Sequence, residues 1–343
     1  MVKEGYRKER LDRGIKARCD SIFMLTSYRE ILYMLLPRVL PIVALIIIPL
    51  VLEVSGQVYW QKVFILACVI SLLAMGWDYL ASVGLVSLGQ ALFFGVGAYI
   101  AGALNHYLKW PIFLTIPVAT LGGALICTLL LAPIIRMRGI YFGMVTLAFP
   151  LFFNRIIEAT KLCGGTEGLP GLTQFPTIWV ATYLIIGALL ICLFAFRRII
   201  DTDYGMVLRG IRDNDRAIMA SGINIYWVKV QAIFICAAAG AFAGAFMSHH
   251  IGIVGMSVFA LDMSIMPVAA VVLGGGGTFA GATLGTFILV PLSEFLRAYG
   301  TLRIAIYSLV MVVCVVGLPE GIFHYLQRKY HQFDRWVTVE AKE

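Results

Sequence analysis

The longest polar segment between two apolar runs, residues 198–229, has the residue types needed to bind another protein. Three consecutive residues, 213–215, carry side-chain oxygens that can accept the free N–H groups of a helix's first turn. Gly222 suits the left-handed conformation that follows a helix end. The pattern predicts a short helix with a small apolar body at residues 217–220, lying at the membrane surface.

Flanking arginines give this short helix a positive border. A helix of this kind can fit a groove on a cytoplasmic partner, or it can simply lie solvated at the interface. We favour docking. The residues expected to take part are Arg209, Arg212, Asp213, Asn214, Asp215, Ala217 and Gly222.

A second group of candidate residues lies inside glycine-punctuated apolar runs. The amide of Gln90 both donates and accepts, so it could meet a zwitterionic ligand or bond to a neighbouring helix. Aromatic rings could line a cavity or pack in the core, and glycine breaks can expose backbone dipoles at a substrate site. The tentative substrate path consists of Gln90, Phe93, Gly95, Tyr99, Gly275, Gly276 and Thr278.

Catalytic and metal-binding patterns are lacking in the sequence. We find no nucleophile–base set, no paired carboxylates on a helix face, and no Gly-x-x-x-x-Gly-Lys-Ser/Thr loop for nucleotide phosphates. His249 and His250 have no further ligands at suitable spacing. Asp78 lies near the cytoplasmic end of an apolar run, where the cost of a charge is reduced, and a structural role is favoured over a proton relay. An enzyme with a cofactor or metal of its own is therefore not expected.

The composition requires a bilayer around these residues. Of 343 residues, 60% are hydrophobic and 13% are charged, whereas soluble domains have about 25% charged residues. The first 30 residues lack the apolar core of a signal peptide. The net charge of +8 lies between the apolar runs rather than on one domain, so nucleic acid is not an expected partner. The seven cysteines are expected to be small buried thiols.

Uncharged runs long enough to cross a bilayer predict an all-α, polytopic helical bundle. Four consecutive glycines, 274–277, divide one long run into two. We expect about ten membrane segments, including Gly-broken or half-helices, at residues 38–54, 62–81, 87–107, 111–135, 139–158, 177–197, 230–250, 262–274, 279–297 and 303–319.

The distribution of basic residues orients the bundle. With both termini in the cytoplasm, the inner segments and the boundary residue Arg197 hold 21 of the 27 Lys and Arg residues. The predicted organisation is a basic cytoplasmic segment at 1–37, a transmembrane domain at 38–319 that contains the cytoplasmic loop 198–229, and a cytoplasmic tail at 320–343. The protein is expected in the cytoplasmic (inner) membrane.

Five segments form a recognisable pattern in this order: Ser87–Tyr99, Arg138–Phe149, Gly164–Leu169, the polar loop Asp203–Asn224 and Val272–Gly285. Together they resemble the permeases of branched-chain amino acid ABC transporters, in particular the M-type subunit, and related urea permeases are similar too. The similarity extends over residues 40–325. Asp78 departs from the neutral Asn that is usual in the family, and Val272–Gly285 resembles the family's paired late segments, so the domain at 38–319 is expected to be a permease domain.

The resemblance implies a multi-subunit importer. Such permeases work with a second permease subunit, two cytoplasmic ATPase subunits that bind ATP, and an external solute-binding protein. It implies that closure of the ATPases pushes the loop at 204–222 and tilts the spans at 177–197 and 230–250. Branched-chain amino acids are the expected substrates. The alternatives are a urea or short-chain amide importer and, more distantly, an ion-coupled secondary transporter.

Overall fold

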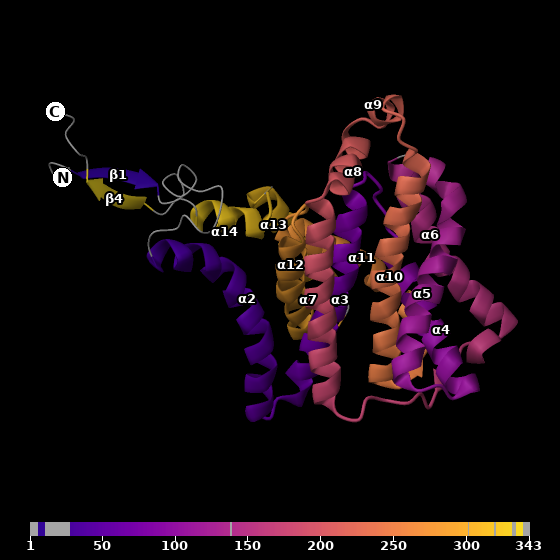
Figure 1. Ribbon diagram of the computed structural model, residues 1–343. Coiled ribbons are helices and arrows are strands. Elements are labelled where there is room, and N and C mark those ends of the chain that lie inside the picture. The colour runs from indigo at the N-terminus through magenta and orange to yellow at the C-terminus, as the bar shows by residue number, and fades with distance from the viewer. Residues whose placement is uncertain are drawn as a thin grey trace.

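The computed structural model describes residues 6–10, 28–137, 139–300, 302–318, 320–330 and 334–338, and in these ranges it is a bundle of helices (Figure 1). Most of the predicted basic segment 1–37, and with it residues 138, 319 and 339–343, lies outside the described residues. The helices are α2 (Tyr28–Val54), α3 (Val58–Ala81), α4 (Gln90–Leu108), α5 (Ile112–Leu131), α6 (Ile140–Thr160), α7 (Ile178–Ile200), α8 (Asp203–Asp213), α9 (Asp215–Ala220), α10 (Ile225–Ile251), α11 (Asp262–Gly274), α12 (Phe279–Phe295), α13 (Leu302–Gly317) and α14 (Ile322–Tyr330).

A helix occupies each of the ten predicted segments, but ten membrane spans are not confirmed. Six helices of the described chain are long and apolar enough to cross a membrane, and α11 and α12 together form a seventh candidate that is bent by 114°. The 13 residues of α11 extend only about 20 Å, less than the ~30 Å of the hydrocarbon core. The Gly-broken pair is therefore one broken span or a re-entrant loop.

Several predicted boundaries differ from the structure, and two of them have clear local reasons. Helix α2 begins at Tyr28, ten residues before the predicted start, because the charged residues that end an apolar run do not end a helix. Helix α4 begins at Gln90, because the Ser87 carbonyl and the Leu88 N–H before it bond to the side chains of Trp77 and Thr146 instead of to helix backbone.

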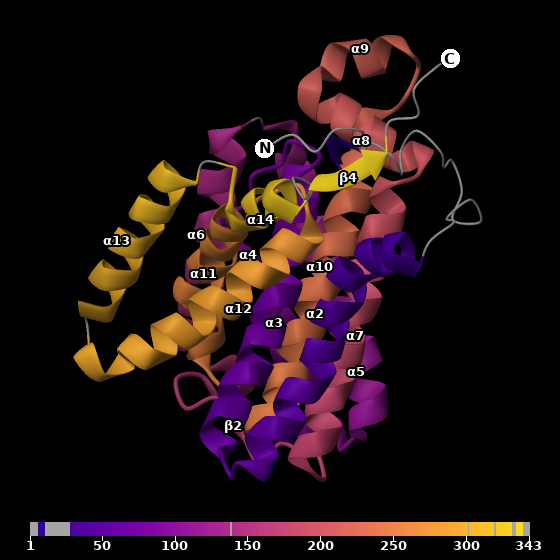
Figure 2. The same ribbon diagram turned by 90° about the vertical axis from the view of Figure 1, so that its left-hand side faces the viewer.

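Helices α3, α4 and α10 form the centre of the bundle. Small residues let them approach closely, as expected where packing replaces the hydrophobic drive. A Cβ on Gly244 of α10 would overlap the carbonyl of Phe94, and one on Gly97 of α4 would overlap the backbone of Ala241. Helices α12 and α13 lie at the edge of the bundle, where α12 crosses it diagonally (Figure 2).

The connection between α3 and α4 contains non-helical backbone, residues 85–89, that is largely buried in the bundle. Non-helical backbone at this depth must find partners within the protein. The indole Nε1 of Trp77 donates to the carbonyl of Ser87 at 2.6 Å, and Leu88 N donates to Thr146 Oγ1 at 3.0 Å. At the start of α4, the N–H of Ala91 donates to Ser264 Oγ at 3.0 Å. Side chains from α3, α6 and α11 thus hold this segment.

Two short ladders mark the two ends of the bundle. β2 (Leu169–Pro170) pairs with β3 (Ile253–Val254), and β1 (Tyr6–Arg10) pairs with β4 (Asp334–Thr338), both antiparallel. The β1–β4 ladder brings segments near both termini together, toward the same end as α8 and α9 (Figure 1). We call this the α8–α9 end.

Candidate functional site

The polar loop between α7 and α10 forms a two-helix unit at one end of the bundle (Figure 1). The predicted short helix is present as α9, and Asn214 caps it by accepting from the N–H groups of Arg216 at 3.1 Å and Ala217 at 3.4 Å. Gly222 follows with a φ of +85°. The sequence predicted one helix here, and α8 was not predicted. Its 11 residues include two glycines, at 205 and 210, and four charged residues, which are not typical of an apolar helix.

Helix α8 is fixed to the end of α7. Its buried residues Leu208 and Ile211 face the bundle. A Cβ on Gly205 would overlap the carbonyl of Ile200, so only glycine allows this approach. The same carbonyl accepts a hydrogen bond from the Arg209 guanidinium at 3.1 Å. Arg209, predicted as a docking residue, therefore also serves to attach α8 to α7.

Helix α9 has no buried residue. Ile218 packs against Gly210 of α8, and the other apolar side chains of α9 are exposed. Met219 is 51% exposed, and Ala217 and Ala220 are also exposed. Among the predicted docking residues, Arg212 and Asp213 are exposed and pair with each other at 3.3 Å. Helix α9 thus offers a small apolar face with charged neighbours, the arrangement that the sequence predicted.

An ion pair connects α9 to α10. The ammonium of Lys229 lies 3.5 Å from a carboxylate oxygen of Asp215, and Lys229 is only 8% exposed. Asp215 therefore points toward the bundle, whereas the sequence analysis predicted it in the docking set. The role of Lys229 was not predicted, because basic residues are common at the cytoplasmic ends of membrane spans and do not by themselves indicate an ion pair.

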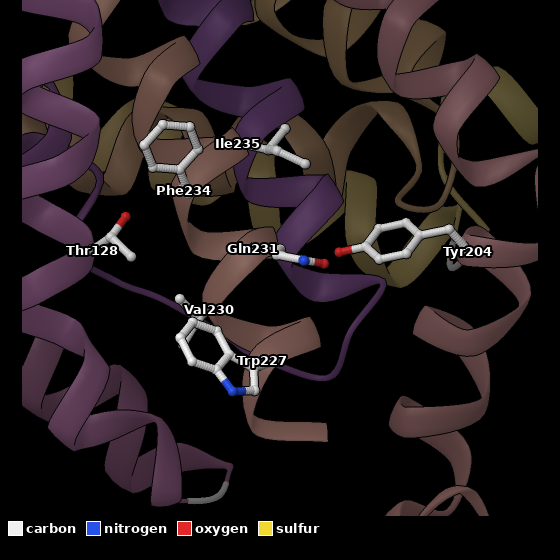
Figure 3. A pocket seen from close by; sticks show the side chains of 7 residues that line it. All are labelled: Thr128, Tyr204, Trp227, Val230, Gln231, Phe234 and Ile235. Atoms are coloured by element: carbon white, nitrogen blue, oxygen red, sulfur yellow. The ribbon is translucent and has the colours of Figure 1, made fainter. Parts of the chain in front are cut away.

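A cavity of about 400 Å³ opens beside this unit, between α5, α8 and α10 (Figure 3). The hydroxyl of Tyr204 and the amide of Gln231 face one another across it. Burial raises the pKa of Tyr204, so the phenol stays protonated. The remaining lining is mostly apolar and comes from Thr128, Trp227, Val230, Phe234 and Ile235.

The tentative substrate-path residues fall into two groups. On α4, Gln90 and Phe93 are fully buried, and the Cβ of Phe93 packs against Gly240 of α10. Within the described chain neither polar atom of the Gln90 amide makes a hydrogen bond, and the weakly polar thiol of Cys236 lies beside it.

Further along α4, Gly95 and Tyr99 contact the ring of Phe259. A Cβ on Gly95 would overlap that ring, and Tyr99 stacks on it with ring centroids 5.6 Å apart. The other group, Gly275, Gly276 and Thr278, lies instead in the turn between α11 and α12. The structure therefore does not bring the seven predicted residues together at one place.

The glycine turn has a partner that the sequence did not indicate. Asp78 of α3 is 3% exposed, and its Oδ1 accepts a hydrogen bond from Gly277 N at 2.7 Å. His324 of α14 lies on the other side of the turn, because a Cβ on Gly275 would be 2.7 Å from its Nδ1. Sequence reasoning could not find this pairing, since Asp78 and Gly277 are 199 positions apart.

Comparison with known proteins identifies the family to which this chain is similar. Residues 60–318 match the family described as "Branched-chain amino acid transport system / permease component". The chain is 25% identical to the high-affinity branched-chain amino acid transport system permease protein LivM of Escherichia coli, over 78% of this chain and 76% of that protein. It is 24% identical to LivM of Salmonella typhimurium over the same shares.

A more distant organism provides a third relative. The chain is 26% identical to a probable branched-chain amino acid transport permease protein LivM of Methanocaldococcus jannaschii, over 61% of this chain and 67% of that protein. No solved structure matches the chain significantly.

Proposed function

This chain belongs to the family of branched-chain amino acid transport permease components, and we propose that it forms the membrane translocation path of an ABC importer for branched-chain amino acids. It is a multi-pass membrane protein and a permease subunit. The substrate class is supported by the names of three relatives. We propose that ATP is bound and hydrolysed on separate cytoplasmic subunits, working with a second permease and an external solute-binding protein.

The observation that carries this proposal is the exposed helix α9 and its attachment to two long helices. Its exposed apolar residues suit a groove on an ATPase subunit. The Asp215–Lys229 ion pair links α9 to α10, and the Arg209–Ile200 hydrogen bond links α8 to α7. A displacement of α9 would therefore be transmitted to α7 and α10, the two helices that border the loop.

We place the cytoplasmic end of the path at the cavity of Figure 3. Its apolar lining suits aliphatic side chains, and the Tyr204 hydroxyl and Gln231 amide supply polar contacts. Because Tyr204 belongs to α8, a displacement of α8 changes the width of this cavity. Gln90, buried near the centre of the bundle, is proposed to contact the substrate when the path is open.

Uptake into proteoliposomes that contain the complete importer tests this function. We expect vanadate-sensitive uptake of labelled leucine with ATP inside and the loaded binding protein outside. Uptake of labelled urea instead would reassign the substrate. Leucine uptake that is insensitive to vanadate and depends on a proton or sodium gradient would overturn the ABC mechanism.

A substitution on α9 tests the docking role. Ala217→Trp places a bulky ring on an exposed face, so we expect the subunit to fold normally but to lose co-purification with the ATPases and to lose uptake. Arg155→Ala is the matched control, because Arg155 forms an exposed ion pair with Glu158 in α6, away from the loop. Unchanged assembly and uptake in Ala217→Trp would contradict the docking role.

A further inference from the structure

The α8–α9 end of α3, with residues 82–84 that follow it, lies between the polar loop that contains α8 and α9 and the glycine turn between α11 and α12. Helix α8 rests directly on it, because a Cβ on Gly84 would lie 3.3 Å from the Cα of Arg212. Gly84 has a φ of +80°, a conformation that favours glycine. Two hydrogen bonds tie this segment to the helix, from Ser82 N to the carbonyl of Asp78 and from Gly84 N to the carbonyl of Ala81, both at 3.0 Å.

The Asp78 side chain then connects the same end of α3 to α12. Its Oδ1 accepts from Gly277 N, two residues before α12 begins. Thr278, the cap residue of α12, makes no side-chain capping bond. A carboxylate is favoured at a helix N-terminus, where free N–H groups and the helix dipole are positive. Asp78 therefore supplies, from another helix, the negative group that α12 lacks locally.

The far side of the turn is closed by the start of α14. Gly321 has no room for a Cβ, which would overlap the Cα of Gly275. Beside it, the ring of His324 covers Gly275, whose φ of +108° again favours glycine. Glu320 is paired with Arg328 at 3.0 Å, so its carboxylate is turned to α14 rather than to Asp78. The turn is thus enclosed between α3 and α14.

We propose that Asp78 is a positioning residue for transport: α8 bears on the end of α3 at Gly84, and the Asp78 carboxylate passes the displacement of α3 to the turn between α11 and α12. This inference rests on the proposed function, because it assumes that the ATPases move α8 and α9. It adds a second route by which that motion reaches the broken span, besides α7 and α10. The hydrogen-bond acceptor at position 78 is the essential feature.

Two substitutions separate the acceptor from the shape of the side chain. Asp78→Leu keeps the branched heavy-atom skeleton, although it is larger, and removes the acceptor, whereas Asp78→Asn keeps an oxygen for Gly277 N. In the complete importer we expect Asp78→Leu to lower the maximal rate of leucine uptake about tenfold, as loss of one hydrogen bond to the Gly277 N–H predicts. The KM for the loaded binding protein should stay unchanged, and Asp78→Asn should restore most of the rate.

These outcomes separate the proposed role of Asp78 from the proposed coupling of α9 to the ATPases. If Ala217→Trp abolishes uptake while Asp78→Leu transports at the normal rate, the relay through Asp78 is wrong and the coupling role stands. If Asp78→Asn is as defective as Asp78→Leu, the acceptor is not the essential feature and the inference is overturned. If Ala217→Trp has no effect, the proposed coupling itself is wrong.

A measurement on the unmodified importer keeps the inference testable should Asp78→Leu fail to fold. Amide hydrogen exchange of the peptide over residues 275–281 is compared between the nucleotide-free and the vanadate-trapped importer. We expect the exchange rate of this turn to change with the nucleotide state, together with that of residues 82–89. An exchange rate that is the same in both states would contradict the relay.

Discussion

At the scale of single residues, two buried charged groups tie helices to one another. Lys229 and Asp78 are each less than a tenth exposed, and each joins its helix to another element: Lys229 to the neighbouring helix α9 and Asp78 to the turn before α12. Buried charges persist only when paired or hydrogen-bonded, because their desolvation is costly. These two residues therefore identify the connections that the bundle has to keep.

The Lys229–Asp215 pair can be tested separately from transport. Lys229→Met removes the ammonium but keeps the aliphatic length, and it leaves the largely covered carboxylate of Asp215 without that ion-pair partner. We expect α9 to lose about 1–3 kcal/mol of local stability, measured as faster amide exchange of residues 215–222.

The double variant Lys229→Met with Asp215→Asn controls for this effect. It removes the carboxylate charge that faced the Lys229 ammonium, so its exchange rate should lie closer to that of the unmodified chain. Equal exchange in the unmodified chain and in Lys229→Met would show that the ion pair does not hold α9.

At the scale of elements, close backbone approach decides how the central helices pack. Gly244 of α10 faces the carbonyl of Phe94, and Gly240 faces the Cβ of Phe93. Both contacts lie on one face of α10, four residues apart, as small-residue packing in membranes requires. Helices α4 and α10 therefore meet along a seam that larger residues would separate.

This seam predicts a strong position dependence of substitutions. Gly244→Val should destabilise the bundle by about 2–4 kcal/mol, because its side chain must push α4 away. Gly187→Val in α7 is the matched control, since a Cβ there meets nothing within 4 Å. Thermal unfolding of both variants in detergent measures the difference. Similar melting temperatures for the two would contradict close packing of α4 on α10.

At the scale of the whole molecule, the structure places α8, α9 and α14 toward one end and the β2–β3 ladder at the other (Figure 2). The basic residues favour the cytoplasm for the α8–α9 end. The orientation is a prediction that sets which side the ATPases and the binding protein occupy.

A cysteine-labelling experiment tests this orientation. In a background without accessible native thiols, Met219→Cys should react with a membrane-impermeant maleimide only after the cells are opened. Glu167→Cys, in the connection after α6, should react in intact cells. Reaction of Met219→Cys in intact cells would place the α8–α9 end outside and would exclude cytoplasmic ATPases as its partner.

The positions of most helices were predictable, because only uncharged runs of sufficient length can lie in the hydrocarbon of a membrane. The predicted ends at Val54, Ala81 and Gly274 coincide with helix ends in the structure. The cap at 213–215 was also predictable, since capping is local. Helix α8 was missed because its amphipathic pattern contains two glycines, and Asp78 lacked a predicted partner because its contact is distant in sequence.

The sequence by itself determined which segments are apolar enough to be immersed, where the glycine break falls, and which loop is polar enough to dock. Only the tertiary structure decided which immersed helices are central. The 18-residue windows of α3 and α7 are both strongly apolar, yet 94% of one is buried and 28% of the other. Lipid tails are as apolar as a protein core, so hydropathy cannot distinguish a helix that faces lipid from one that faces protein.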